Sequence, residues 1–207
     1  MTGFMNIDPA TLGQRDTYQI LISGIVPRPI AFVSTVSDGG SPNLAPFSFF
    51  TGVCPKPPTL CFSVLPRRTG KKDTLRNIEA TREFVVNVVS ERFAEAMNQT
   101  AADYPPEVDE FTVAGFTPMA SERVRPPRVG EALISMECKL VEIRHYGETP
   151  YIASLIFGEV VLFHLSHEVY RNGEVDYAVL RAVGRMGRDL YCRTGDLFEM
   201  KRPRLTG

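Results

Sequence analysis

The sequence predicts a mainly β fold, a closed antiparallel β-barrel with a few short attached helices. Three observations lead to this fold class. Strand-like runs bounded by Gly or Pro dominate the chain, and the first of two long runs in its second half nearly alternates apolar and polar residues. In addition, strands do not alternate with long helices, as they would in a parallel α/β sheet.

The first half of the chain contains four strand-like runs, at 29–37, 43–52, 58–65 and 84–90. The second run is unusual, because Asn43, Pro46 and Ser48 are interleaved with phenylalanines. Proline donates no hydrogen bond to a sheet, so this strand is expected to be weak. The residues between the first two runs, "SDGGS", suit a tight turn.

Helices are expected to be few and short. After the third strand the period changes: Leu75, Ile78 and Ala80 have roughly helical spacing, and Asp73 or Thr74 is a suitable N-cap. A second short helix is expected from Ser90 onward. Residues 1–24 are only weakly patterned, and the polar, Pro-rich residues 101–131 are expected to form a long excursion packed on the barrel surface.

Two longer strands are expected at 132–147 and 151–165, joined by a hairpin marked by Gly147 and Pro150. Gly158 is a candidate for a bulge or bend of the kind that closing barrels need. The chain of 207 residues suits a single domain spanning 1–207, with its core at about 15–192 and a C-terminal extension at 193–207.

Charge and composition exclude several classes of protein. The 23 basic and 24 acidic residues give a net charge of −1, which argues against nucleic-acid binding through general positive charge. There is no apolar run of the roughly 20 residues needed to cross a membrane, and no signal peptide is visible, so we expect a cytoplasmic protein. The four cysteines form no C-x-x-C pair, so a zinc site is not expected.

The segment "RRTGKKDT" (67–74) combines a glycine, four basic residues and a helix start. Free N–H groups at a helix N-terminus, with Lys and Thr beside them, bind phosphate well. The alternative is a solvated basic loop with an ordinary helix cap.

The segment "NLAPFS" (43–48) offers hydroxyl, amide and aromatic groups, together with backbone groups that Pro46 frees from the ladder. Such a surface suits a flat polar heterocycle, which needs hydrogen bonds at its edge and apolar contact on its face. The alternative is an ordinary edge strand. His164 and His167 lie three residues apart without an evident third ligand, so no metal site is expected there.

Taken together, these segments resemble the flavin reductase-like, FMN-binding split-barrel family, in the branch of flavoredoxins and of reductase components of two-component monooxygenases. The resemblance covers about residues 15–192. Its matching segments include "PRPIAFVST" (27–35), "PNLAPFSFF" (42–50), "PPTLCFSV" (57–64), "GKKDTLRNI" (70–78) and "EFVVNVVS" (83–90). It implies a Greek-key antiparallel split barrel. One position departs from the pattern, since Arg188 stands where the family often has a glycine.

The resemblance also implies which residues bind FMN. The residues that match the cofactor-binding positions of the family are Ser34, Thr35, Ala45, Pro46, Phe47, Ser48, Arg67, Arg68, Lys72, Asp73 and Thr74. The first two would contact the ribityl phosphate or ring edge, the next four would line the ring, and the others would bind the phosphate. No catalytic side chain is implied, because the flavin itself carries the chemistry.

The implied function is that of an NAD(P)H-dependent flavin oxidoreductase, which passes reducing equivalents through FMN to free flavin, ferric chelates or a partner oxygenase. The co-substrate would be NADH or NADPH. Members of the family are homodimers, and the partner subunit could complete the site around Arg185–Tyr191. Two alternatives are a flavoredoxin-like electron carrier with little nicotinamide activity and a non-redox binding module.

Overall fold

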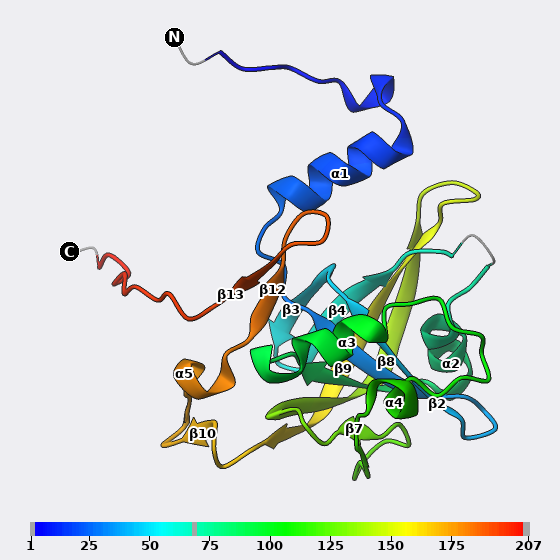
Figure 1. The fold of residues 1–207 in the computed structure, drawn as a ribbon, viewed down its shortest axis with the longest axis vertical. Helices are drawn as coiled ribbons and strands as arrows, with labels where there is room; N and C mark the ends of the chain where they lie inside the picture. The colour runs from blue at the N-terminus through cyan, green and yellow to red at the C-terminus, as the bar shows by residue number, and fades with distance from the viewer. Residues whose placement is uncertain (1–2, 68–69, 205–207) are drawn as a thin grey trace.

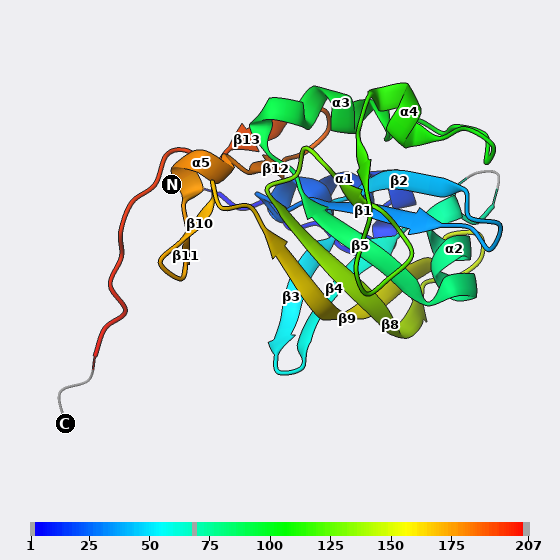
Figure 2. The ribbon, with the colours of Figure 1, turned by 90° about the horizontal axis from the view of Figure 1, so that it is seen from below.

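The computed structural model describes residues 3–67 and 70–204. Its main feature is a seven-stranded, fully antiparallel sheet in the order β2-β1-β5-β8-β9-β4-β3, curled around an apolar core (Figures 1 and 2). The strands are β1 (Ala31–Val36), β2 (Pro42–Phe47), β3 (Phe50–Pro55), β4 (Pro58–Val64), β5 (Glu83–Val88), β8 (Ile134–Tyr146) and β9 (Ala153–Leu165). The predicted mainly β, antiparallel fold is confirmed.

The run predicted as one strand at 43–52 is in fact two strands, β2 and β3, separated by a bend at Ser48–Phe49. These two strands form opposite ends of the sheet order, so the barrel is split between them. The chain therefore changes direction sharply after Phe47, although the apolar residues suggested one continuous strand.

The edge position of β2 explains its prolines. The Leu44 N–H donates to the Glu110 carboxylate, away from β1. Because backbone groups in an antiparallel strand alternate in direction, the nitrogens of Pro42 and Pro46 also face away from β1. Proline is tolerated at such outward-facing positions, since no ladder hydrogen bond is lost there.

Helices flank the barrel. They are η1 (Pro9–Thr11), α1 (Gln14–Gly24), α2 (Asp73–Thr81), η2 (Glu91–Phe93), α3 (Ala94–Gln99), α4 (Glu110–Ala114) and α5 (Tyr177–Leu180). The weakly patterned lead-in therefore contains a helix, α1, that the sequence did not predict. Within the described residues, no helix is both long and apolar enough to span a lipid bilayer.

Short strand pairs complete the chain: β6 (Pro118–Met119) with β7 (Arg128–Val129), β10 (Tyr170–Arg171) with β11 (Glu174–Val175), and β12 (Val183–Arg185) with β13 (Tyr191–Arg193). The first pair belongs to the excursion at 101–131, which packs on the barrel as predicted. Figure 2 shows α3 and α4 on one side of the barrel near β2, and α2 at one end.

Two apolar clusters hold these layers together. The barrel interior contains residues from every strand of the sheet, together with Leu75 and Ile78 of α2. A second cluster lies between the sheet and the helices α3 and α4, where the ring of Phe32 packs 5.2 Å from that of Phe116 and 6.4 Å from that of Phe93. These contacts fix α4, and with it Glu110, against the outer edge of β2.

Two positions marked in the sequence have clear physical roles. A Cβ at Gly158 would lie 2.2 Å from the Phe84 ring, so this glycine makes room for a core side chain. The expected irregularity lies beside it, because the β8–β9 register shifts directly after the Leu140–Gly158 pair, and a second shift follows the Glu137–Leu162 pair. Arg188 has φ of 54°, in the left-handed region that glycine favours. The backbone at Arg188 therefore keeps the conformation that glycine suits best.

Candidate functional site

A cleft lies where the end of β2 meets the end of β4. It has a volume of about 160 Å³ and is lined by Tyr18, Pro46, Phe47, Ser48, Phe49, Ser63, Leu65 and Lys72. We call it the β2 cleft. The structure thus brings together four of the predicted site residues: Pro46, Phe47, Ser48 and Lys72. The lining as a whole combines apolar faces with the hydroxyl groups of Tyr18, Ser48 and Ser63 and the ammonium group of Lys72.

The N-terminus of α2 lies beside this cleft. The N-cap is Lys72, not Asp73 or Thr74 as predicted, and no side chain caps the helix. The first hydrogen bonds of the helix run from Leu75 N–H and Arg76 N–H to the Lys72 carbonyl. An α-helix leaves its first N–H groups free and carries partial positive charge at this end, which favours anions.

Basic side chains surround this helix start. The half-buried Lys72 places its Nζ 5.8 Å from the centre of the Phe47 ring, and burial, with the nearby Arg67 charge, lowers the pKa of this lysine. Arg67 pairs with Asp73 at 3.1 Å and with Asp103 at 3.0 Å. Arg76 also pairs with Asp73. The other predicted arginine, Arg68, lies outside the described residues.

A buried polar cluster connects α2 to β1 and β2. The Asn43 side-chain amide donates to the hydroxyls of Thr35 at 3.1 Å and Thr74 at 3.0 Å. Asn77 donates to the same Thr35 hydroxyl at 3.0 Å. All four side chains are buried. This cluster holds the first turn of α2 against the sheet, next to the β2 cleft.

Ser34 and Thr35 point to opposite faces of β1, as adjacent residues of a strand must. Both are fully buried. The Ser34 hydroxyl donates to the Pro127 carbonyl in the excursion, while Thr35 belongs to the cluster beneath α2. A direct contact of either hydroxyl with a ligand stays a prediction. Ala45 is half-buried and packs against the barrel core.

The buried carboxylate of Glu110 lies at the outer edge of β2, on the side that faces away from β1. Glu110 is 4% exposed and accepts the Leu44 N–H at 3.0 Å. Burial raises the pKa of Glu110, and the Leu44 N–H bond opposes that increase. Since Leu44 N–H is already bonded, the outward-facing groups of β2 that remain for a ligand lie nearer to Ser48.

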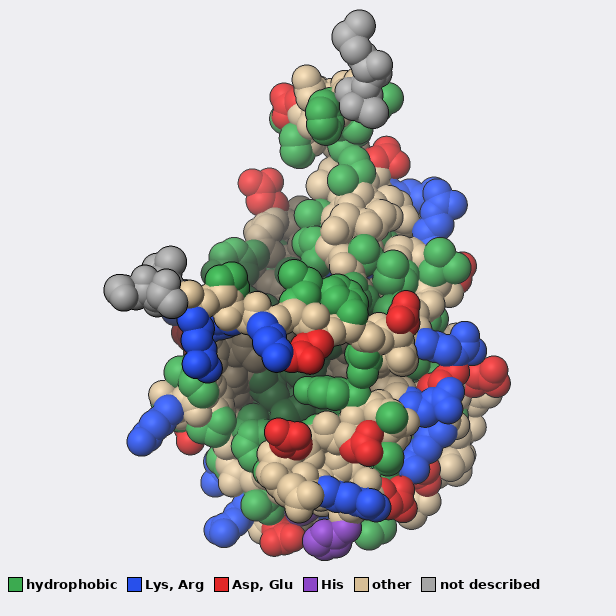
Figure 3. Space-filling view, turned by 90° about the vertical axis from the view of Figure 1, so that its left-hand side faces the viewer, with side chains coloured by type: hydrophobic (Ala, Val, Ile, Leu, Met, Phe, Trp, Pro, Cys, Tyr) green, Lys and Arg blue, Asp and Glu red, His purple; other side chains and the backbone are tan. Residues whose placement is uncertain are grey.

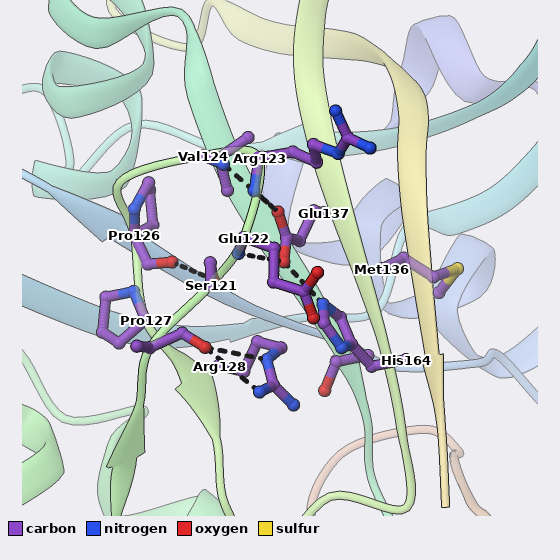
Figure 4. Close-up of polar contacts among 12 residues, drawn as sticks. Ser121, Glu122, Arg123, Val124, Pro126, Pro127, Arg128, Met136, Glu137 and His164 are labelled. Carbon is purple, nitrogen blue, oxygen red and sulfur yellow. Dashed lines mark hydrogen bonds and ion pairs between the residues drawn. The ribbon is translucent and has the colours of Figure 1, made fainter.

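His164 has a structural partner. Its Nε2 lies 2.5 Å from Glu137 Oε1, and the same fully buried carboxylate accepts the N–H groups of Glu122, Arg123 and Val124 at 2.8, 2.6 and 3.2 Å (Figure 4). This cluster fastens the excursion to β8. Among residues 3–67 and 70–204, no group of three His, Cys, Asp or Glu side chains could hold a metal ion.

A larger hollow of about 980 Å³ lies elsewhere, between the η2–α3 segment and β13. None of the predicted site residues lines it. Its rim carries Glu91, which is paired with Arg181 and Arg193. We therefore assign the candidate site to the β2 cleft, where the predicted residues converge.

Three residues near the cleft were missed by sequence reasoning. Tyr18 comes from the unpredicted α1, and its ring lies edge-on to Phe49 with 6.3 Å between centroids. Asn77 lies in the predicted helix, but nothing in the sequence showed which way it faces. Asn43 lies in the run "PNLAPFS". An amide side chain in a strand is unusual enough to be noticed in the sequence, but the sequence did not show which residues it bonds.

Known proteins share this fold. The structure is similar to that of nitrilotriacetate monooxygenase component B from Bacillus cereus, with a TM-score of 0.93 and 36% identity over 97% of this chain and 100% of that chain. It is also similar to Pseudomonas fluorescens 2-nitrobenzoate 2-nitroreductase NbaA, with a TM-score of 0.88 and 31% identity over 98% of each chain.

In sequence, an uncharacterized protein from Aquifex aeolicus is 44% identical over 179 residues, covering 85% of this chain and 89% of its own length. Residues 23–180 match the family model described as the flavin reductase like domain. Since the match spans most of the chain, this protein belongs to the flavin reductase-like family.

Proposed function

We propose that this protein binds FMN in the β2 cleft and acts as an NAD(P)H-dependent flavin oxidoreductase, passing electrons through FMN to free flavin or to a partner oxygenase. The observation that carries the proposal is the uncapped N-terminus of α2, with Lys72 both at its N-cap and in the wall of the cleft. Membership of the flavin reductase-like family supports the flavin.

The residues around the cleft fit FMN. Its phosphate would be held by Lys72, the first N–H groups of α2 at Asp73 and Thr74, and the charges of Arg67 and Arg68. Before a phosphate arrives, Arg67 is balanced by Asp73 and Asp103. An incoming phosphate dianion would compete with these carboxylates for the arginine.

The ring of FMN would lie along 45–48, at the outer edge of β2. Pro46 and Phe47 offer apolar contact, and by the alternation of an antiparallel strand the Pro46 carbonyl faces away from β1. An edge strand is suited to this task, because its outward N–H and C=O groups have no neighbouring strand to bond. When bound, FMN supplies the electron-transfer chemistry; the side chains of this protein bind it, orient it and shield it from water.

We further propose a homodimer that closes the site. Helix α1 buries only Ile22, while Ile20 and Leu21 are 50% and 47% exposed. A helix of 11 residues is marginal in water without tertiary packing. Figures 1 and 3 show α1 and the N-terminal segment extending beyond the barrel, with hydrophobic side chains gathered over that part of the surface.

Further exposed apolar side chains lie at both ends of the chain. Phe4 is 94% exposed and Phe198 is 83% exposed. A second copy of the chain would bury such groups, and because Tyr18 of α1 lines the β2 cleft, it would also stabilise one wall of the site. The four free cysteines agree with a reducing compartment, so we propose the cytoplasm.

Two titrations and one assay test the function. Purified protein freed of flavin is titrated with FMN and with riboflavin, and FMN should bind at least tenfold more tightly, as one charge-assisted hydrogen bond predicts. Oxidation of NADH and NADPH is then followed with FMN present. Equal affinity for the two flavins would contradict the phosphate site, and tight FMN binding without nicotinamide oxidation would favour the flavoredoxin-like alternative.

A further inference from the structure

Arg28 is a buried cation that has no carboxylate partner among the described residues. It is 4% exposed, and its guanidinium donates only to neutral acceptors. Nη1 bonds the carbonyls of Ile22 and Ile25, the latter at 2.7 Å, and Nη2 bonds the Met186 carbonyl at 2.8 Å. A buried charge without a counter-charge is costly, so its presence requires a reason.

The charged and titratable groups facing Arg28 do not balance it. Burial lowers the pKa of Arg28, Tyr18 opposes this, and the positive charge of Arg185 adds to it. An arginine stays protonated in proteins even so. The positive charge of Arg28 is therefore met only by main-chain carbonyls, among them those at the C-terminal end of α1, which carry partial negative charge.

Arg28 lies behind the wall of the β2 cleft, in a neighbouring hollow of about 410 Å³ that shares Ser48 and Phe49 with the cleft. Its Nε donates to the Ser48 Oγ in a long hydrogen bond of 3.5 Å, and its Cζ lies 5.9 Å from the centre of the Phe49 ring. Ser48 and Phe49 both line the cleft. Since the Ser48 oxygen accepts from Arg28, the hydroxyl hydrogen of Ser48 remains available to donate into the cleft.

We propose that Arg28 is a positioning residue that acts through Ser48 to raise the reduction potential of the bound flavin. This inference rests on the proposed FMN site. Reduction adds electron density to the flavin ring. A hydroxyl donor held toward the ring, with a cation behind it that no carboxylate neutralises, stabilises the reduced form more than the oxidised form.

Arg28 also has a purely structural effect, because its bonds to Ile22, Ile25 and Met186 fasten the end of α1 to the segment after β12. The two roles separate by charge. Arg28→Lys keeps the cation and loses part of the fork of donors, whereas Arg28→Gln keeps an amide donor and loses the cation. A purely structural role would be weakened by both substitutions.

The experiment measures the reduction potential of bound FMN by equilibration with a reference dye, in wild type, Arg28→Gln, Arg28→Lys and Ser48→Ala. Arg82→Gln is the control, since the Arg82 guanidinium also bonds main-chain carbonyls but lies outside the cleft. Unfolding by urea is measured on the same samples, which reports the structural role separately.

We expect Arg28→Gln to lower the potential by about 30 mV or more, which is a tenfold loss of preference for reduced flavin in a two-electron couple. Arg28→Lys and Arg82→Gln should stay close to wild type, and Ser48→Ala should fall in the same direction as Arg28→Gln. A potential that is unchanged in both Arg28→Gln and Ser48→Ala would overturn the inference.

Ser48 is half-buried at the bend, so we expect Ser48→Ala to fold. If Arg28→Gln does not fold, the potential of Ser48→Ala tests the inference without it. An unchanged potential in Ser48→Ala would then overturn the inference. Wild-type protein that binds no FMN would instead overturn the proposed function. Wild-type protein that binds FMN, with variants that keep its potential, would overturn only the role of Arg28.

Discussion

Replacing Glu137 by glutamine should destabilise the protein through the cluster in Figure 4. The fully buried carboxylate accepts three backbone N–H groups and faces His164. Glutamine turns one acceptor oxygen into a donor that faces other donors. At least one charge-assisted hydrogen bond is lost, at about 1.5–3 kcal/mol, and a buried N–H is left without a partner. We therefore expect a loss of about 3 kcal/mol near pH 7.

This loss should depend on pH. Burial raises the pKa of Glu137, but the N–H groups of Glu122 and Arg123, together with His164, outweigh it and leave the pKa below its ordinary value. The stabilising contribution is therefore fully present above the unfolded-state pKa of about 4.3 and is lost as the pH falls through the lower folded-state pKa. The gap between wild type and Glu137→Gln should close in that acidic window.

Urea unfolding at several pH values measures both effects. Glu122→Gln is the matched control, because Glu122 contributes only its backbone N–H to the cluster and its side chain is exposed. We expect this control to lie within about 0.5 kcal/mol of wild type. A Glu137→Gln protein as stable as the control at neutral pH, or a gap that persists unchanged in acid, would refute this account of the cluster.

Three other outcomes follow from the site and its surroundings. Lys72→Ala should weaken FMN binding about ten- to a hundred-fold at low salt without unfolding the protein, as measured by fluorescence titration; an unchanged dissociation constant would place the phosphate elsewhere. Light scattering at micromolar concentration should report a homodimer, and a monomer that still binds FMN would contradict the role given to α1. Arg188→Gly should raise the unfolding free energy by roughly 0.5–1 kcal/mol, because glycine adopts the left-handed conformation at φ of 54° without strain; a less stable variant would show that the arginine side chain matters more.

The parts of the fold that were predictable are those whose signal is local. Strand β8 alternates apolar and polar residues over its first half, strand β9 is a long and mostly apolar run, and both were found within a few residues of their ends. Helix α1 was not found, because its apolar residues are confined to the short stretch from Tyr18 to Ile22 and do not repeat over several turns, and only Ile22 is buried. The bend after β2 was missed because apolar residues continue through it.

In the candidate site, too, the residues with a local sequence signal were predictable and those brought together by the fold were not. The basic loop and the helix start at Lys72 are contiguous in sequence, so their chemistry could be recognised there. Asn43 bonds Thr35, 8 positions away, and Thr74, 31 positions away. No periodic pattern in the sequence predicts contacts at these separations. The interaction of Arg28 with Met186 spans 158 positions. Contacts of this kind form only when the sheet curls into the split barrel, so the sequence alone does not reveal them.

The proposed role of β2 as the edge that binds the flavin leads to a prediction for single backbone amides. Leu44 N–H is bonded to Glu110, and the N–H groups of Ala45 and Phe47 face β1, so all three are satisfied without a ligand. By the same alternation, the next outward-facing N–H belongs to Ser48. FMN binding should therefore slow hydrogen exchange at Ser48 and Phe49 much more than at Leu44.

Exchange should slow also at Asp73 and Thr74, whose N–H groups lie at the uncapped start of α2, while β8 inside the sheet should change little. Hydrogen exchange with single-residue resolution, with riboflavin as the matched ligand, separates the two parts of the site. Riboflavin lacks the phosphate, so it should protect Ser48 but not Asp73 or Thr74. If FMN protects only the start of α2, the phosphate site stands, but β2 does not bind the ring, and the weak strand with its two outward prolines is then explained by its edge position alone.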